Sequence, residues 1–265
     1  MALAPEFTPA DLAEQPAAEL LDALRTPLSR PAAEQLLDPA AGTVAIGQYA
    51  DGTPAAVPLW TEHGAVPLGI VGDAGAGASV ILRHLWEAEA ASPLVRSWVA
   101  GFDQEPEHYL GTPFERHAGD PEAIYHLLDD AAQIAGRRAA DMSNWPDTYR
   151  PTEAEPLVTL TLTMWELTRT DRDSVRLVER IAATGRRGGV SLRIVYRRHA
   201  VQTLGHALAQ RLGSGALIAL RGGEFGLGLG SGPVAVPKDM PGTGHLITPR
   251  RTGLFRSWAP RPAAG

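Results

Sequence analysis

Hydrophobic residues along this chain follow two alternating patterns. Short apolar runs rich in β-branched residues predict strands, and longer segments with apolar residues three or four positions apart predict amphipathic helices. The predicted strands lie at residues 67–71, 94–100, 157–164, 190–196 and 216–220, and the predicted helices at 80–86, 120–134, 173–185 and 202–212. Strands separated by helix-length segments favour right-handed crossovers between parallel strands. The pattern therefore predicts an α/β fold with a mainly parallel sheet flanked by helices.

Two helix ends carry clear local signals. Asp120 followed by Pro121 is typical of a helix start, because the carboxylate caps backbone N–H groups and proline fits the first helical position. Gly185 is typical of a helix end, because glycine accepts the left-handed conformation that often stops a helix. We therefore expect one helix to begin at Asp120 and another to stop at Gly185.

The amino-terminal part of the chain is organised differently. It is rich in Ala and Pro and contains two helical patches, the first with Thr8 as its expected cap. Residues 43–49 and 55–60 favour a β-hairpin, since Asp51-Gly52 between β-rich runs is typical of a tight reversal. The sequence thus divides into an amino-terminal helical segment, a main domain and a tail, at residues 1–41, 42–260 and 261–265.

Glycines are concentrated in the turn between the strand at 67–71 and the helix at 80–86. Residues 72–79 have the spacing G-x-x-x-x-G-K-[ST] of a phosphate-binding loop, except that Ala78 replaces the lysine. In such a loop, backbone N–H groups and the helix N-terminus point at an anion. The expected nucleotide-binding positions are Gly72, Gly75, Gly77, Ala78, Ser79 and Val80, with the Ser79 hydroxyl as the expected magnesium ligand. The structural alternative is that the glycines only permit a tight turn.

Composition limits the class of protein. The 265 residues are 44% hydrophobic, which is enough for one sizeable core. The absence of cysteine excludes disulfides and thiolate metal sites, and the eight histidines show no metal-ligand spacing. No apolar run approaches the ~20 residues of a membrane-spanning helix, and the first residues lack the positive charge of a signal peptide. We therefore expect a cytoplasmic protein without a transmembrane segment.

Charge is distributed unevenly along the chain. Residues 1–150 contain 22 acidic and 8 basic side chains, whereas residues 151–265 contain 8 acidic and 16 basic ones. Such asymmetry indicates one of two arrangements. Either the second half carries a face that binds nucleic acid or an acidic partner, or the two halves meet and neutralise each other. Lys238 is the only lysine, so no nearby lysine replaces the one missing from the loop.

With these elements placed, the chain resembles the motor domain of FtsK/SpoIIIE/TraB-type DNA translocases from about Gly42 to Trp258. Residues 46–54 are similar to that family's amino-terminal hairpin, 72–79 to its Walker A loop and 151–166 to its Walker B strand with the preceding segment. Residues 183–190 resemble its GRAAGI turn, 196–198 its sensor triplet, and 241–244 with 255–258 its last strands. The resemblance implies a RecA-like P-loop NTPase fold, ATP with Mg²⁺ as cofactors, and double-stranded DNA as a partner.

The departures from that family fall on the chemistry. Its lysine corresponds to Ala78, its magnesium-organising Asp to Trp165 and its sensor Gln to Arg197, while Asp73 adds an anion to the loop. Ser79 and the carboxylate Glu166, at the position of the family's water-orienting acid, remain. Phosphoryl transfer needs positive charge on the phosphates, so the substitutions predict weak ATP and Mg²⁺ binding and inefficient hydrolysis.

Arginines offer a second candidate site. Arg186, Arg187, Arg197 and Arg198 are predicted to form a cluster that bridges subunits or contacts phosphate, or else a solvated face paired with the acidic half. Glu166 is either a catalytic carboxylate or an exposed residue at a strand end. An arginine from a neighbouring subunit is a further source of charge.

Three functions are consistent with these residues. The first is a P-loop protein with degenerate Walker motifs, a pseudoATPase that acts as a subunit, adaptor or regulator in double-stranded DNA translocation or plasmid transfer. The second is an active ATP-dependent DNA translocase, working as a homo-hexamer. The third is a protein-only interaction module of a secretion or assembly complex. A hetero-assembly with an intact FtsK-like subunit is the expected setting of the first.

Overall fold

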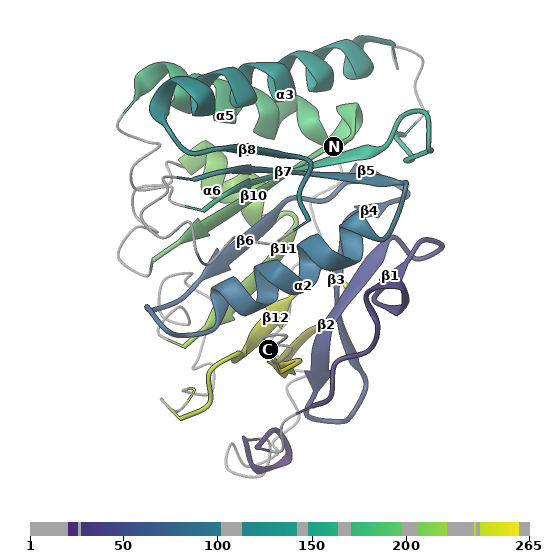
Figure 1. Cartoon of the computed structure of the whole chain (residues 1–265), viewed down its shortest axis with the longest axis vertical. Helices are drawn as coiled ribbons and strands as arrows, with labels where there is room; N and C mark the ends of the chain where they lie inside the picture. Colours follow the sequence, from purple (N-terminus) through teal and green to yellow (C-terminus); the bar gives the residue numbers. More distant parts are fainter. Residues whose placement is uncertain are drawn as a thin grey trace.

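The computed structural model describes residues 21–25, 28–101, 113–141, 148–163, 171–197, 206–221, 236 and 239–259. Its centre is an 11-stranded sheet (Figure 1). Parallel pairing builds one part of it, from β6 (Leu68–Val71), β7 (Val95–Ala100), β8 (Arg116–Ala118), β9 (Leu157–Leu162), β10 (Val190–Tyr196) and β11 (Ala216–Leu220). These strands lie in the order β11-β6-β10-β9-β7-β8, so β10 separates the loop strand β6 from β9.

Antiparallel pairing extends the sheet beyond β11. The added strands are β12 (Thr243–Ile247), β13 (Thr252–Ser257), β2 (Thr43–Tyr49), β3 (Pro54–Pro58) and β1 (Leu37–Asp38), which follows a short 3-10 helix η2 (Ala33–Gln35). β2 and β3 form the predicted hairpin, with Gly52 at a positive φ of 82°. β4 (Trp60–Thr61) and β5 (Gly64–Ala65) pair separately. Because β1 pairs with β2, the sheet takes in residues that precede position 42.

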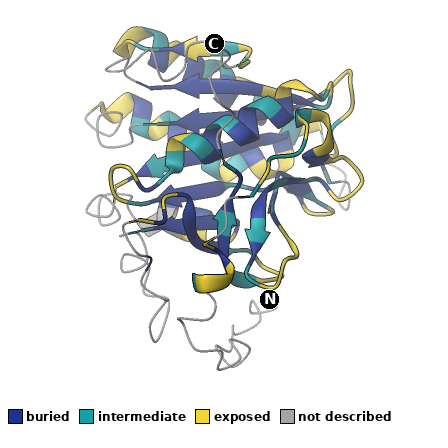
Figure 2. Cartoon of the chain, turned by 60° about the horizontal axis from the view of Figure 1, so that its bottom comes forward, coloured by how far each residue is buried: buried dark blue, intermediate teal, exposed yellow. Residues whose placement is uncertain are grey.

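Helices cover both faces of the sheet. They are α2 (Ala78–Ala90), α3 (Pro121–Asp141), α5 (Arg172–Gly188) and α6 (His206–Gly213). Ile70 of β6 belongs to the core that contains Trp86 of α2, whereas the next residue, Val71, belongs to the core that contains residues of α3, α5 and α6. Successive strand residues face opposite sides, so α2 covers one face and the other three helices cover the second. Figure 2 shows buried strands between helices whose outer sides are exposed.

The predicted fold class is confirmed, and so is the predicted start of α3. The Asp120 carboxylate accepts a hydrogen bond from the Ala123 N–H at 2.9 Å, as expected of a cap. The predicted end of α5 at Gly185 is wrong, because the helix continues to Gly188 and stops where Gly189 takes a φ of 65°. Gly185 has a packing role instead, since a Cβ there would lie 2.3 Å from the Val190 carbonyl oxygen.

Several predictions fall on residues that the structure does not describe. They include the helical patch that begins at Thr8, the tail at 261–265, and the three site residues Trp165, Glu166 and Arg198. Within the described ranges, none of the helices combines the length and the apolar character that crossing a membrane requires.

Candidate phosphate-binding site

The glycine-rich loop lies at the carboxyl edge of the parallel strands. It connects the end of β6 at Val71 to the start of α2 at Ala78. Since β10 and β11 both run parallel to β6 and flank it, the residues that follow them, Arg197 and Arg221, belong to the same edge of the sheet. This edge is where ligands bind in open α/β sheets.

Two glycines give the loop its shape. Gly75 has a φ of 73°, and Gly77, the residue before α2, has φ 105° and ψ 10°. A Cβ on Gly77 would lie 2.6 Å from the backbone nitrogen of Gly242, so no other residue fits without movement of the backbone. Gly77 caps α2 without a side-chain hydrogen bond. The Val80 N–H donates to the Gly77 carbonyl at 3.1 Å, so among the described contacts the Ala78 and Ser79 N–H groups are the ones left at the helix N-terminus for an anion.

The predicted binding residues differ in exposure. Ser79 and Gly75 are exposed, and Gly72, Gly77, Ala78 and Val80 are half-buried. The half-buried Ala78 methyl group packs against the core beneath α2. Asp73 is exposed. The loop thus offers backbone donors and one hydroxyl, but no cation of its own.

A cation missed by the sequence analysis lies against the loop. The Arg221 guanidinium donates through Nη2 to the Ala74 carbonyl oxygen at 2.9 Å, and the Arg221 carbonyl accepts from the Asp73 N–H at 2.9 Å. Arg221 directly follows the strand predicted at 216–220. Because parallel strands end at one edge, that position was the signal that could have identified it.

Neighbouring backbone also holds the loop in place. Ala76 is 1% exposed, and its carbonyl oxygen accepts a hydrogen bond from the Gly242 N–H at 2.8 Å. Its own N–H donates to the Asp73 carbonyl at 3.1 Å. The loop is therefore tied to β11 on one side and to the turn before β12 on the other.

The described members of the predicted arginine cluster lie at two separate places. Arg186 and Arg187 lie in the last turn of α5, which precedes β10, whereas Arg197 is exposed directly after β10. The seven residues of β10 separate the two positions by about 20 Å. Arg186 donates through Nε to the His63 carbonyl at 3.1 Å and is held near β5 instead. The remaining member, Arg198, is outside the described residues.

Magnesium has limited support in the described part of the chain. The Ser79 hydroxyl is exposed at the start of α2 and suits an oxygen-preferring cation. Over the same residues, no group of three His, Asp or Glu side chains is arranged to hold a metal ion. The residues present therefore fit a phosphate group better than they fit a tightly held metal.

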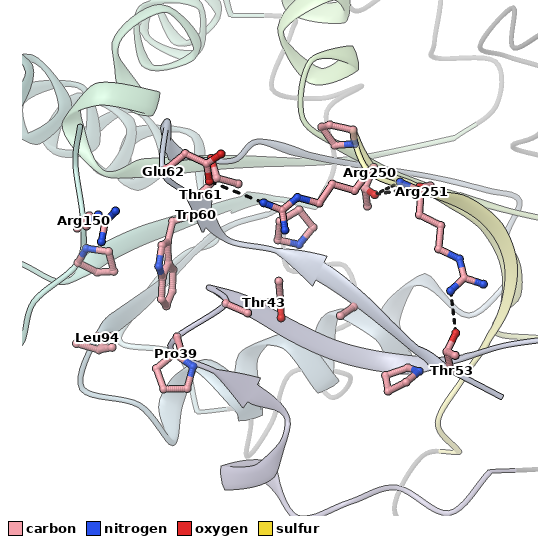
Figure 3. Close-up of a pocket in the computed structure, with 18 of the residues that line it drawn as sticks. Pro39, Thr43, Thr53, Trp60, Thr61, Glu62, Leu94, Arg150, Arg250 and Arg251 are labelled. Atoms are coloured by element: carbon pink, nitrogen blue, oxygen red, sulfur yellow. Dashed lines mark hydrogen bonds and ion pairs between the residues drawn. The ribbon is translucent and has the colours of Figure 1, made fainter. Parts of the chain in front are cut away.

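Figure 3 shows a cavity that is the second candidate site and is lined by none of the loop residues 72–80. It has a volume of about 670 Å³ and lies beside β2, β3 and the turn between β12 and β13. Small or apolar residues and three arginines line it, among them Thr43, Pro54, Ala56, Trp60, Arg150, Arg250 and Arg251. Arg250 approaches the Glu62 carboxylate at 3.8 Å, and both side chains are largely exposed. The cavity therefore combines a floor of small residues with a mainly basic rim.

One end of this cavity is fixed by a charged group. Arg251 donates to the Asp51 carboxylate at 2.6 Å and to the Thr53 hydroxyl at 2.8 Å, and its guanidinium lies 3.7 Å from the ring centre of Tyr49. Hydrogen bonds from the Thr53 hydroxyl and N–H, together with Arg251, lower the pKa of Asp51 to about 2. Burial raises the pKa of Tyr49. Arg251 is therefore occupied by internal contacts, in contrast to the looser contact of Arg250.

Comparison with known proteins adds information at the level of the fold. Neither a protein-family model nor a curated protein matches the sequence. ATPases 2 and 3 of Thermomonospora curvata EccC, solved with a signal sequence peptide, match with a TM-score of 0.68 and 18% identity, over 89% of this chain and 44% of that one. ATPases 2 and 3 of EssC from Geobacillus thermodenitrificans match with a TM-score of 0.65 and 17% identity, over 90% and 48%.

A conjugation protein has the same fold. The pCW3 coupling protein TcpA, solved as a monomer with ATPγS, matches with a TM-score of 0.64 and 17% identity, over 89% of this chain and 71% of that one. This chain thus has the RecA-like fold of P-loop ATPases, and it spans less than half the length of the EccC and EssC structures.

Proposed function

We propose that this chain binds a nucleoside phosphate at residues 72–80 without turning it over efficiently, and acts as a subunit or adaptor of a larger ATPase assembly. One observation carries the proposal. Gly77 takes the positive φ from which α2 begins and leaves the Ala78 and Ser79 N–H groups outside the described hydrogen bonds, while Ala78, at the sequence position of the lysine of such loops, packs against the core. The phosphate cradle is retained and a main catalytic cation is absent.

Electrostatic magnitudes explain why binding and turnover separate. The N-terminus of a helix provides about half an elementary charge, which suits a bound phosphate. Removal of one preorganised group that stabilises developing charge typically lowers the rate by about 10²–10³. The exposed carboxylate of Asp73 opposes charge on the ligand as well. ATP with Mg²⁺ supplies the phosphoryl group when bound, and in this chain the loop amides and the Ser79 hydroxyl would hold it.

Nucleotide titration tests this proposal. We expect calorimetry to detect ATP and ADP binding by the full chain, and hydrolysis assays to detect no turnover above background. The double variant Ala78→Lys, Trp165→Asp should bind ATP more tightly. Turnover by the unmodified chain at the rate of an ordinary motor, about 1 s⁻¹ or faster, would refute the proposal and favour the active translocase.

Association with double-stranded DNA is part of the same proposal, and it rests on the basic half of the chain. A protein that neutralises phosphates binds DNA less tightly as salt rises. We expect affinity for a duplex of about 30 base pairs to fall steeply between 50 and 200 mM NaCl, with loss on Arg197→Glu and none on Arg96→Glu at the other end of the strands. Binding that is insensitive to salt, or absent at 50 mM, would contradict this part.

Oligomeric state is tested by sedimentation with and without ATP. The chain alone tests the homo-hexamer, and the chain mixed with an intact FtsK-like subunit tests the hetero-assembly.

The cavity of Figure 3 favours one alternative, a protein-interaction module. Its exposed Arg250 and Arg150 border a floor of small residues, which suits an extended acidic peptide. The structurally similar EccC was solved with a signal sequence peptide. A fluorescein-labelled peptide of alternating Glu and Leu should bind the chain, and the variant Arg150→Glu, Arg250→Glu should weaken that binding at least tenfold. Unchanged binding by the variant would exclude this cavity.

A further inference from the structure

Arg221 is placed beside the loop by the register of two parallel strands. In β11, Ala219 pairs with Val71, the last residue of β6. Continuing that register brings Arg221 beside Asp73, and the hydrogen bond from the Asp73 N–H to the Arg221 carbonyl agrees with it. The position of Arg221 is therefore set by the sheet itself.

The side chain of Arg221 reaches the tip of the loop. Its Nη2 atom donates to the Ala74 carbonyl at 2.9 Å. The same atom lies 3.9 Å from the position that a Cβ on Gly75 would take. Arg221 is half-buried, so its charge is partly shielded from solvent.

We propose that Arg221 supplies, from β11, the positive charge that Ala78 no longer supplies from α2, and that it binds the phosphates of a nucleoside di- or triphosphate. The inference rests on the proposed nucleotide binding. A guanidinium suits this role because its planar set of N–H donors matches two phosphate oxygens at once and remains charged at all physiological pH values. Its bond to Ala74 fixes the charge against the same loop whose amides face the anion.

The origin of the charge also fits the loss of turnover. A lysine in the usual position extends from the first turn of the helix, whereas Arg221 is bonded to the loop at Ala74 and tied to Asp73 through its backbone. A cation anchored in this way neutralises bound phosphate without replacing the missing metal-organising Asp at Trp165. We therefore assign Arg221 to binding of the ligand and not to catalysis.

Exchange and rescue variants test the assignment. Arg221→Gln removes the charge but keeps an N–H donor for Ala74, and should weaken ADP and ATP binding about 10- to 100-fold, the effect of losing one charged hydrogen bond. Arg221→Lys should stay within about fivefold of the unmodified chain. Adding Ala78→Lys to Arg221→Gln should restore at least tenfold in affinity. The control Arg96→Gln, an equal loss of charge at an exposed site, should change affinity less than twofold.

The outcomes separate the role of Arg221 from the proposed function. If the unmodified chain binds nucleotide and Arg221→Gln binds it within threefold, the role of Arg221 is refuted while nucleotide binding stands. If the unmodified chain binds none and Ala78→Lys does, the loop is a phosphate site that Arg221 fails to complete. If neither binds, both proposals are refuted. Melting temperatures without nucleotide identify a variant that fails to fold, in which case rescue by Arg221→Lys decides the result.

Discussion

A buried charged cluster holds α2 against the sheet and allows a sharp test of the fold. Glu89 near the end of α2 and Arg193 in β10 are both 0% exposed, and the guanidinium bonds the carboxylate directly. The second oxygen of Glu89 accepts hydrogen bonds from Ser97 Oγ of β7 at 2.5 Å and from Thr159 Oγ1 of β9 at 2.9 Å. One side chain of α2 therefore connects the helix to three adjacent strands.

Removal of either charge leaves the other buried without its partner. Arg193→Met leaves the Glu89 carboxylate with two hydroxyl donors, and Glu89→Gln leaves a guanidinium whose Nε and Nη1 have no hydrogen-bond partner among the described residues. Each single substitution should lower the free energy of unfolding by about 3–5 kcal/mol. The double variant carries no buried charge, and its glutamine still accepts from the two hydroxyls, so it should lose only about 1–3 kcal/mol.

Urea denaturation of the four proteins measures this coupling. The sum of the two single losses in the free energy of unfolding should exceed the loss in the double variant by about 3 kcal/mol or more. This difference is a large coupling energy for two residues in contact. The exposed pair of Arg96 and Glu115, 3.3 Å apart and about half exposed, is the control, and Arg96→Met should cost less than about 1 kcal/mol. Single losses that add up to the double loss within 0.5 kcal/mol would refute the reasoning.

Two further predictions concern local geometry and pH. Gly77→Ala should lower the free energy of unfolding by about 2–4 kcal/mol, because it combines a φ of 105° with a backbone clash, whereas Gly52→Ala, at φ 82° with no atom within 4 Å, should lose about 1 kcal/mol; equal losses in urea denaturation would contradict this. Asp51 has a folded-state pKa of about 2, lowered by Thr53 and Arg251. Its stabilisation is therefore present above the ordinary pKa near 3.9 and lost as the pH falls towards 2. The unmodified chain and Asp51→Asn should differ in the free energy of unfolding by less than about 1 kcal/mol at pH 7, because the group is exposed. This difference should vanish near pH 2. A constant difference from pH 5 to pH 2 would count against the assignment.

Local patterns predicted the elements well wherever one physical cause dominated. The β-branched run at 190–196 is β10 to the residue, and Asp120 caps α3 as its chemistry indicates. The end of α5 failed because two causes compete at Gly185. Glycine ends helices when it adopts a positive φ, but at Gly185 it is needed for close packing against β10, and Gly189 takes the positive φ instead. The sequence does not distinguish these two uses of glycine.

The candidate site was predictable only in its backbone. The motif identified the loop at 72–79 and the loss of its lysine, because both are contained in eight consecutive residues. Arg221 contacts Ala74 across 147 positions of sequence, and Arg193 contacts Glu89 across 104. An arginine within an apolar strand, as at position 193, does indicate a buried partner. The identity of that partner depends on strand order, which the pattern alone left open.

The shape of the loop has structural causes that operate without any ligand. Gly77 meets the backbone of Gly242, a Cβ on Gly72 would lie 2.9 Å from the Cβ of Leu220, and Ala76 is buried in the core. These contacts would preserve the glycines even in a protein that had lost its nucleotide, so the conformation of Gly77 supports nucleotide binding only together with the N–H groups and the charge that face the loop. The charge of Arg221, in contrast, can be removed while an N–H donor to the Ala74 carbonyl is kept, as in Arg221→Gln. Whether nucleotide affinity follows that charge is therefore the comparison that separates a retained binding site from a retained scaffold.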